Sequence, residues 1–231
     1  NHTSSSLASG SGAMSPVYLQ TVEAYLEYFR HLKKDGVLHI NHHLYPRMIT
    51  TAARAWKELG RENFRQHVFV MEHKDLPDNL PTMLIKMSPW SSDEVKEMEN
   101  LLNSKNAYRL VVNPLDESRN YLTEEFFHGR LSDETIDHIP YQVHAVTDDK
   151  PFFNFIRKSL KVEKIDHTRF VNPSVAQLLN KRREAGLPLD VLHLFVTGVG
   201  SLVFALVVLG IPFLFSRTGR TAWQGKVPFL V

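Results

Sequence analysis

The sequence of 231 residues contains no cysteine. Disulfide bonds, thiolate metal sites and a cysteine nucleophile are therefore excluded. An excess of one charge is also missing, since the net charge is +2 at pH 7, and this balance gives no reason to expect a nucleic-acid-binding protein. Hydrophobic residues make up 43% of the chain and charged residues 23%, which excludes a wholly disordered or collagen-like protein.

Charged side chains are absent from the whole stretch Val191–Ser216. As a helix, this stretch would be roughly 39 Å long at about 1.5 Å per residue. The hydrocarbon core of a bilayer is about 30 Å thick, so the stretch predicts a transmembrane helix. The alternative is a buried core helix, but core helices of this length normally have a polar face.

The basic residues are concentrated around this apolar stretch. Residues 1–150 carry 16 Lys and Arg against 21 Asp and Glu, whereas residues 151–190 carry eight against four. An excess of Lys and Arg marks the cytoplasmic side of a membrane helix. We therefore expect a membrane protein whose soluble part is cytoplasmic, in contact with the lipid bilayer and not with nucleic acid.

The two ends of the sequence lead us to expect a fragment of a longer protein. The chain does not begin with Met, and Val227–Val231 is the start of a further apolar segment. We expect the parent to be polytopic, with further transmembrane helices beside this one.

Helical spacing of apolar residues predicts a first helix over Tyr18–Leu32. Ser15 and Pro16 provide an N-cap and a first helical residue, and the core-facing stripe includes Tyr18. Two further helices are predicted, from about Pro46 to Leu59 and, behind an S-x-x-E capping box, from Ser91 to about Asn103.

Short apolar runs predict four strands, at Val37–Ile40, Val68–Met71, Met83–Met87 and Tyr108–Val112. Alternating helices and strands predict a mainly parallel sheet with helices on both faces. The loop between the second and third strands is too short for a helical crossover, so these two strands should pair antiparallel.

The rest of the chain divides by composition. Residues 114–150 are polar and predict loops, followed by short helices at Phe152–Leu160 and Val175–Arg183. The predicted domains are a folded part over 1–112, a loop-rich and basic extension over 113–190, the transmembrane helix over 191–216, and a loop with the start of another apolar segment over 217–231.

Three stretches carry a resemblance to a known family: Tyr18–Leu38, the strand pair ending in LIKMSPW, and TDDKPFFNF at Thr147–Phe155. They resemble the spermidine synthase-like domains of bacterial polytopic membrane proteins. This resemblance implies the bacterial inner membrane as the location. The resemblance implies an α/β fold, the C-terminal half of a Rossmann-like class I methyltransferase fold with an antiparallel terminal strand pair. The N-terminal half, with its glycine-rich nucleotide loop, is not in this chain.

The resemblance also implies a chemistry. The cofactor would be S-adenosylmethionine or its decarboxylated form, and the reaction methyl or aminopropyl transfer to a small molecule, possibly an amine. The family carries an aspartate-rich loop before the first helix, but the corresponding residues Asn1–Ser6 include no acid. Transfer to an amine needs a group that holds the cation and accepts a proton.

Candidate site residues follow from position. His2 and Glu23 are the candidate catalytic residues, the second as the acid nearest the expected cleft. Candidate substrate-binding residues lie in the N-terminal stretch, the first helix, the end of the first strand and the TDDKPFF motif: Thr3, Ser4, Tyr18, Thr21, His42, His43, Asp148 and Asp149. His42 and His43 follow a strand, where α/β sheets bind ligands.

Each candidate also has a structural interpretation. Thr21 and Glu23 lie in the opening turns of a helix, where a negative charge is favourable by itself. Asp148 and Asp149 would cap the predicted helix that follows them. The histidines His39, His42 and His43 could pack in the fold, and a single strand does not easily bring them to one ion, so no metal site is predicted.

Two functions remain open at the level of the sequence. The first is a membrane-tethered, spermidine synthase-like transferase domain. The second is a non-catalytic ligand- or partner-binding domain of a membrane transporter or scaffold, which the missing aspartates favour.

Overall fold

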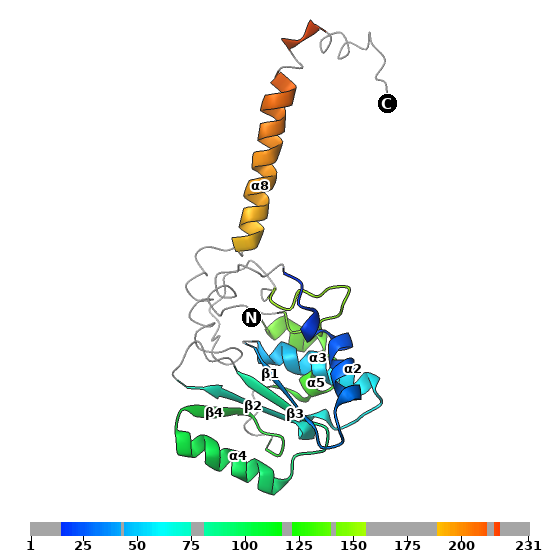
Figure 1. Ribbon diagram of the computed structural model, residues 1–231, viewed down its shortest axis with the longest axis vertical. Helices are drawn as coiled ribbons and strands as arrows, with labels where there is room; N and C mark the ends of the chain where they lie inside the picture. Colours follow the sequence, from blue (N-terminus) through cyan, green and yellow to red (C-terminus); the bar gives the residue numbers. More distant parts are fainter. Residues whose placement is uncertain are drawn as a thin grey trace. The chain divides into compact units, whose positions relative to one another are not determined.

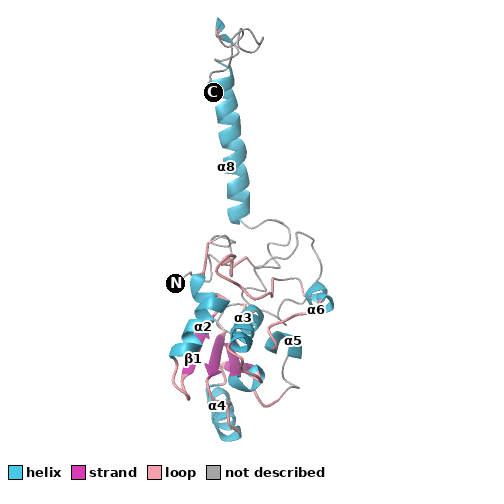
Figure 2. Ribbon diagram, turned by 90° about the vertical axis from the view of Figure 1, so that its right-hand side faces the viewer, coloured by secondary structure: helices cyan, strands magenta, loops and turns pink. Residues whose placement is uncertain are grey.

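A computed structural model describes residues 15–42, 44–74, 81–116, 122–139, 142–155, 189–211 and 215–217. The chain divides into two compact units, residues 1–188 and 189–231. The first unit holds a four-stranded sheet with helices on both faces, as Figures 1 and 2 show. The second unit is a long helix.

The sheet has the strand order β1-β3-β2-β4, with β1 at Val37–Asn41, β3 at Thr82–Lys86, β2 at Val68–His73 and β4 at Tyr108–Val112. Every hydrogen-bonded pair in it is antiparallel. The predicted antiparallel pairing of the second and third strands is confirmed, but the predicted mainly parallel sheet is wrong.

The reason for the error lies in the position of β3. Because β1 and β2 are both antiparallel to β3, they run in the same direction, as the helical crossover between them requires. The hairpin from β2 places β3 between β1 and β2, so these two parallel strands are not neighbours in the sheet. This is a split βαβ unit.

The helices cover the two faces unequally. On one face lie α2 (Val22–His31), α3 (Tyr45–Glu58) and the short α5 (Glu124–Phe127), and α4 (Ser92–Lys105) covers the other face (Figure 1). Strand β2 serves both cores, since its alternate residues point to opposite faces.

The larger core lies on the α3 side of the sheet. It includes Val68 and Val70 of β2 together with Trp56 of α3 and Phe29 of α2. The smaller core packs Phe69 of β2 against Trp90 and the inner side of α4. The prediction of helices on both faces is therefore confirmed.

The first helix begins later than predicted. A 3-10 turn, η1 at Tyr18–Gln20, comes first, and the N-cap of α2 is Thr21, whose hydroxyl accepts the N–H of Ala24 at 3.3 Å. The predicted cap at Ser15 is wrong, because Thr21 supplies the capping oxygen. Tyr18 was expected to face the core, but it lies before the helix and is 57% exposed.

Of the other predicted elements, one is confirmed and others differ from the structure. The capping box of Ser91 and Glu94 is formed at the start of α4. Two short helices, α5 and α6 (Asp133–His138), lie in the stretch predicted as loop. A short 3-10 helix, η2 at Phe64–His67, leads into β2. Residues 152–155 form a turn and not the start of a helix, and the segment Val175–Arg183 lies outside the described residues.

The second unit contains α8 (Leu189–Ala205), which continues as the π-helical segment η5 (Leu206–Gly210). Its 20-residue stretch Val191–Gly210 is long and apolar enough to cross a membrane, and the chain buries none of its most apolar window. A core helix would be buried, so the exposed stretch is a hint of a membrane anchor.

Two glycines with positive φ make a matched pair for a stability test. Gly129, with φ of 67°, follows α5 and lies against α3, where a Cβ would approach the backbone nitrogen of Arg54 to 2.5 Å. Gly60, with φ of 70°, ends α3, and a Cβ there would meet nothing within 4 Å. The two positions therefore share the conformational cost but not the steric one.

We expect Gly60→Ala to lower the free energy of unfolding by about 1 kcal/mol, the cost of a left-handed alanine. Gly129→Ala should lower it by about 1–3 kcal/mol more, because α5 must move away from α3. Urea unfolding followed by tryptophan fluorescence measures both values. Equal losses would contradict the close approach of α5 to α3.

Candidate functional site

The carboxyl ends of β1 and β2 lie at the same edge of the sheet, because these strands run in the same direction. Open α/β sheets bind ligands outside such an edge. His42 follows β1 directly, and Glu72 lies near the end of β2. We therefore take this edge as the candidate site.

His42 is buried and both of its ring nitrogens have partners. Nδ1 accepts the backbone N–H of Leu44 at 3.2 Å, so the ring proton is on Nε2, which donates to the side-chain oxygen of Asn154 at 2.9 Å. The ring also packs edge-on against Phe153, with 4.5 Å between the centroids. The imidazole is therefore neutral and joins the end of β1 to the TDDKPFF motif.

Arg47, in the first turns of α3, fastens the same motif. Its Nη1 donates to the carbonyl oxygens of Phe152, Phe153 and Phe155 at 3.0, 2.8 and 3.2 Å, and its Nε donates to the carbonyl of His144 at 3.2 Å. Burial lowers the pKa of the Arg47 guanidinium to about 10, so it stays charged at neutral pH. Segment 142–155 is held across the edge by a buried cation.

Three acids meet at one turn of this segment. A carboxylate oxygen of Glu23 accepts the N–H of Asp148 at 3.0 Å, although the two residues are 125 positions apart. Asp149 accepts a hydrogen bond from the Thr147 hydroxyl, which lowers the pKa of the Asp149 carboxyl. All three acids are exposed. The structure thus brings together Glu23, one of the two catalytic candidates, and two of the substrate-binding candidates.

The other candidates are placed differently. Thr21 is fully buried as the cap of α2, and its hydroxyl also donates to the carbonyl of Tyr18 at 3.0 Å. His2, Thr3, Ser4 and His43 lie outside the described residues. Within the described part of the chain, no group of three or more His, Asp or Glu residues could hold a metal ion.

Glu72 is a buried carboxylate that the sequence analysis missed. It lies opposite Arg109 of β4, whose guanidinium donates to one of its oxygens, while the other oxygen, Oε2, is buried and has no partner among the described residues. Burial raises the pKa of the Glu72 carboxyl despite the nearby arginine. The sequence carried little signal for this pair, because Arg109 lies in the predicted fourth strand and the second strand was predicted to end at Met71, before Glu72.

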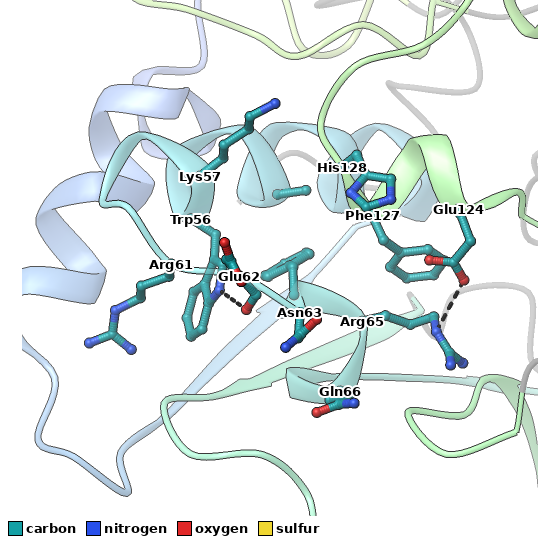
Figure 3. A pocket seen from close by; sticks show the side chains of 12 residues that line it. Trp56, Lys57, Arg61, Glu62, Asn63, Arg65, Gln66, Glu124, Phe127 and His128 are labelled. Atoms are coloured by element: carbon teal, nitrogen blue, oxygen red, sulfur yellow. Dashed lines mark hydrogen bonds and ion pairs between the residues drawn. The ribbon is translucent and has the colours of Figure 1, made fainter.

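One hollow of the folded unit lies away from these acids. A cavity of about 500 Å³ is lined by the C-terminal end of α3, residues 61–66 and α5 (Figure 3). Arg65 pairs with Glu124 across it at 3.1 Å, and Trp56 donates its indole N–H to the carbonyl of Glu62 at 3.0 Å. The cavity adjoins the amino end of β2, at the sheet edge opposite the three acids.

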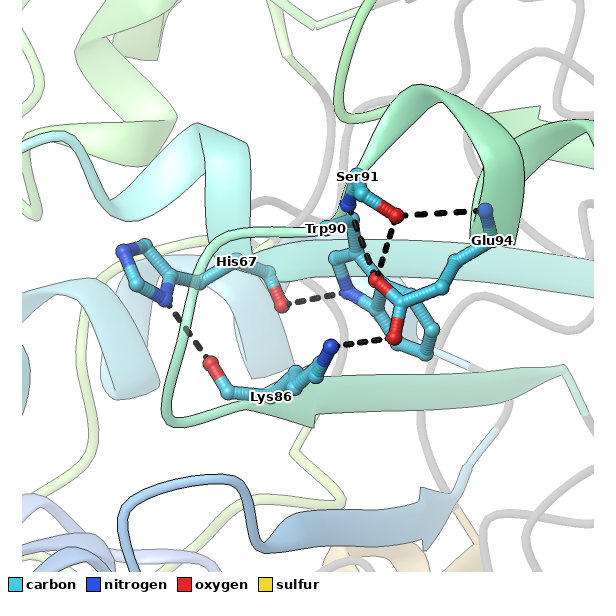
Figure 4. A network of polar contacts seen from close by, with 5 residues as sticks. All are labelled: His67, Lys86, Trp90, Ser91 and Glu94. Atoms are coloured by element: carbon cyan, nitrogen blue, oxygen red, sulfur yellow. Dashed lines mark hydrogen bonds and ion pairs between the residues drawn. The ribbon is translucent and has the colours of Figure 1, made fainter.

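A second polar network is structural. Trp90 donates to the carbonyl of His67 at 2.9 Å, and His67 Nδ1 donates to the carbonyl of Lys86 at 2.8 Å (Figure 4). Lys86 pairs with Glu94, and hydrogen bonds from Lys86 and Ser91 lower the pKa of Glu94 to about 2. These contacts join β3, η2 and α4.

Comparison with known proteins adds no relative. No family model matches the chain, and neither the curated proteins nor the solved structures contain a match. The geometry of the site and the residues that carry the resemblance are therefore the basis for a functional proposal.

The role of Arg47 can be tested against Arg54 on the same helix, which is half-exposed and pairs with Glu58. Arg47→Met removes the donors to four carbonyls, so we expect the amides of residues 146–155 to lose hydrogen-exchange protection by about tenfold or more. Arg54→Met should leave that protection unchanged. Retained protection in Arg47→Met would show that the segment is held by other contacts.

The Glu72–Arg109 pair predicts an asymmetric double-mutant cycle at pH 7. Arg109→Ala leaves a buried, uncompensated carboxylate and should lower the free energy of unfolding by about 3 kcal/mol. Glu72→Gln should cost less, because the half-exposed Arg109 can be hydrated by solvent. Adding Glu72→Gln to Arg109→Ala should recover most of the loss, and an additive cycle would contradict the pairing.

Because of Glu72, the free energy of unfolding should also depend on pH. Because the pKa of Glu72 is raised from its ordinary value of 4.5, the folded chain keeps a proton that the unfolded chain has released above that pH. The contribution of Glu72 to the free energy of unfolding therefore falls as the pH rises from 4.5 through the raised pKa. The Glu72→Gln variant should lack this fall.

Proposed function

We propose that this chain is part of a membrane-tethered, spermidine synthase-like transferase domain that acts on an amine, with S-adenosylmethionine or its decarboxylated form as donor. One observation supports the proposal most. The two distinctive stretches of the resemblance, Tyr18–Leu38 and Thr147–Phe155, pack against each other beside the carboxyl end of β1. The Glu23–Asp148 hydrogen bond joins the two stretches directly, and the N–H of Val22 donates at 2.7 Å to the carbonyl of Val146, the residue just before the second stretch.

In the proposed fold, the β1–α3–β2–β3 unit corresponds to the C-terminal half of a class I methyltransferase domain. Its antiparallel terminal pair, β2 and β3, agrees with that assignment. The chain would be anchored in the bacterial inner membrane by Val191–Gly210, beside further helices of the parent, with the folded unit in the cytoplasm.

The described residues do not form a site for the sulfonium donor. His42 and Arg47, the buried polar residues at the β1 edge, bond to the chain's own groups. The glycine-rich loop that would hold a nucleotide after a strand is missing from the sequence. We therefore assign no donor contact to the described residues, and we assign to them only the amine side of the proposed reaction.

On the amine side, Glu23, Asp148 and Asp149 place three carboxylates at one exposed turn. A protonated amine is attracted to such a group, and a carboxylate can accept the proton that the nitrogen must lose. The attraction acts through solvent, so the expected affinity is weak and falls with salt.

The test uses the full chain in detergent micelles with 1,4-diaminobutane as probe. We expect the amide resonances of Asp148 and Asp149 to shift, with a Kd on the order of millimolar at low salt. Glu23→Gln, Asp148→Asn and Asp149→Asn should each weaken binding severalfold. The matched control is Glu27→Gln, an exposed acid on the same helix that pairs with Arg30.

Two results would overturn parts of this proposal. Equal binding by all variants would remove the amine assignment. Binding of S-adenosylmethionine by this chain alone at micromolar concentration would show that the donor site is complete here, against the assignment of only the amine side.

A second candidate function, a non-catalytic ligand- or partner-binding domain of a membrane transporter or scaffold, has its own support. The cavity beside α5 has about 500 Å³, the size of a small-molecule site, and it lies apart from the three acids. Under this alternative, 1,4-diaminobutane should not distinguish the acid variants from the Glu27→Gln control.

A further inference from the structure

Three large apolar side chains are exposed where two distant segments of the folded unit meet. Leu19 is 72% exposed, Tyr18 57% and Phe152 37%. The N–H of Val17 donates to the carbonyl of Pro151 at 2.7 Å, so the three residues flank one hydrogen-bonded contact. Single exposed apolar residues are ordinary, but a group of them on a surface marks an interaction site. We call Tyr18, Leu19 and Phe152 the Tyr18 patch.

The backbone of the Tyr18 patch is fixed from within the fold. The carbonyl of Tyr18 accepts from the Thr21 hydroxyl at 3.0 Å, and the carbonyl of Leu19 accepts from the Tyr28 hydroxyl at 3.1 Å. The carbonyl of Phe152 accepts from the buried Arg47. All three carbonyls are therefore held by side chains of the fold, while the apolar side chains remain exposed to solvent.

We propose that the Tyr18 patch is a membrane-contact surface, which lays this part of the folded unit on the lipid bilayer. The same chain carries the apolar helix Val191–Gly210, so the patch would face a bilayer to which its own chain is tethered. Tethering raises the effective concentration of a weak second contact to the millimolar range. Tyr, Phe and Leu are residue types that enter the headgroup region of a bilayer.

Charge beside the Tyr18 patch determines which lipid it fits. The acids Glu23, Asp148 and Asp149 lie at the adjoining turn, where Lys150 is the only basic residue of the Thr147–Pro151 stretch. A negative surface is repelled by anionic headgroups. The contact is therefore apolar, and it fits a zwitterionic surface better than an anionic one.

The absence of cysteine allows a direct test with single-cysteine variants. Leu19→Cys in the full chain is labelled with an environment-sensitive fluorophore and reconstituted in phosphatidylcholine nanodiscs that contain a lipid-borne nitroxide quencher. The matched control is Leu101→Cys on α4, a leucine that is 52% exposed. Val203→Cys, within the apolar helix, reports separately whether the chain is anchored.

We expect strong quenching at positions 203 and 19 and little at 101. Replacing Tyr18 and Phe152 by Ser should reduce quenching at position 19 severalfold, and so should replacing a third of the lipid by phosphatidylglycerol. Quenching at 203 should persist under both changes.

Other outcomes overturn the proposal in distinguishable ways. Quenching at 203 but not at 19 would support the anchor and contradict the membrane-contact surface. No quenching at either position would contradict both. Equal quenching at 19 and 101 would show a contact without site specificity. Protection of the label at 19 in detergent that rises with protein concentration would identify a second copy of the chain as the occupant.

Discussion

The buried guanidinium of Arg47 is the contact on which the arrangement of the candidate site depends. It is a charged group in a low-dielectric setting, and it is tolerated there because four backbone carbonyls of residues 144–155 accept its hydrogen bonds. Those carbonyls in turn belong to a segment without regular secondary structure, which has few other partners for them. The cation and the segment therefore stabilise each other, and the segment lies against the carboxyl end of β1.

The position of segment 142–155 determines which residues lie together at this edge of the sheet. Holding residues 142–155 against α3 brings Asp148 to Glu23 and Asn154 to His42. It also brings Pro151 to Val17, which sets the exposed side chains of Tyr18, Leu19 and Phe152 around one point. An acidic turn and an apolar patch thus adjoin on one surface. If the patch faces the bilayer, an amine that reaches the acids would be bound close to the membrane surface.

The opposite side of the folded unit is stabilised by other means. Strand β2 is central and carries both cores, with Phe69 on the α4 face and Val68 and Val70 on the α3 face. The charged side chains of this region, Lys86 and Glu94, connect β3 to the capped start of α4. Glu72, also on β2, lies at the other end of this strand, at the same sheet edge as His42, and one of its buried oxygens lacks a described partner. An unsatisfied buried carboxylate oxygen is costly, so a bound water is a natural partner for it.

The sequence by itself determined most of the local elements: the apolar periodicity of α2, the capping box of α4, the four strands and the apolar helix are all visible in patterns within a few residues of the chain. It also identified Glu23, Asp148 and His42 as residues of interest. Only the tertiary structure decided that β3 lies between β1 and β2, because strand order depends on contacts between residues far apart in the chain. For the same reason the burial of Glu72 opposite Arg109, and the four carbonyls around Arg47, could not be predicted. A side chain's partners across a fold are not encoded in its spacing along the chain.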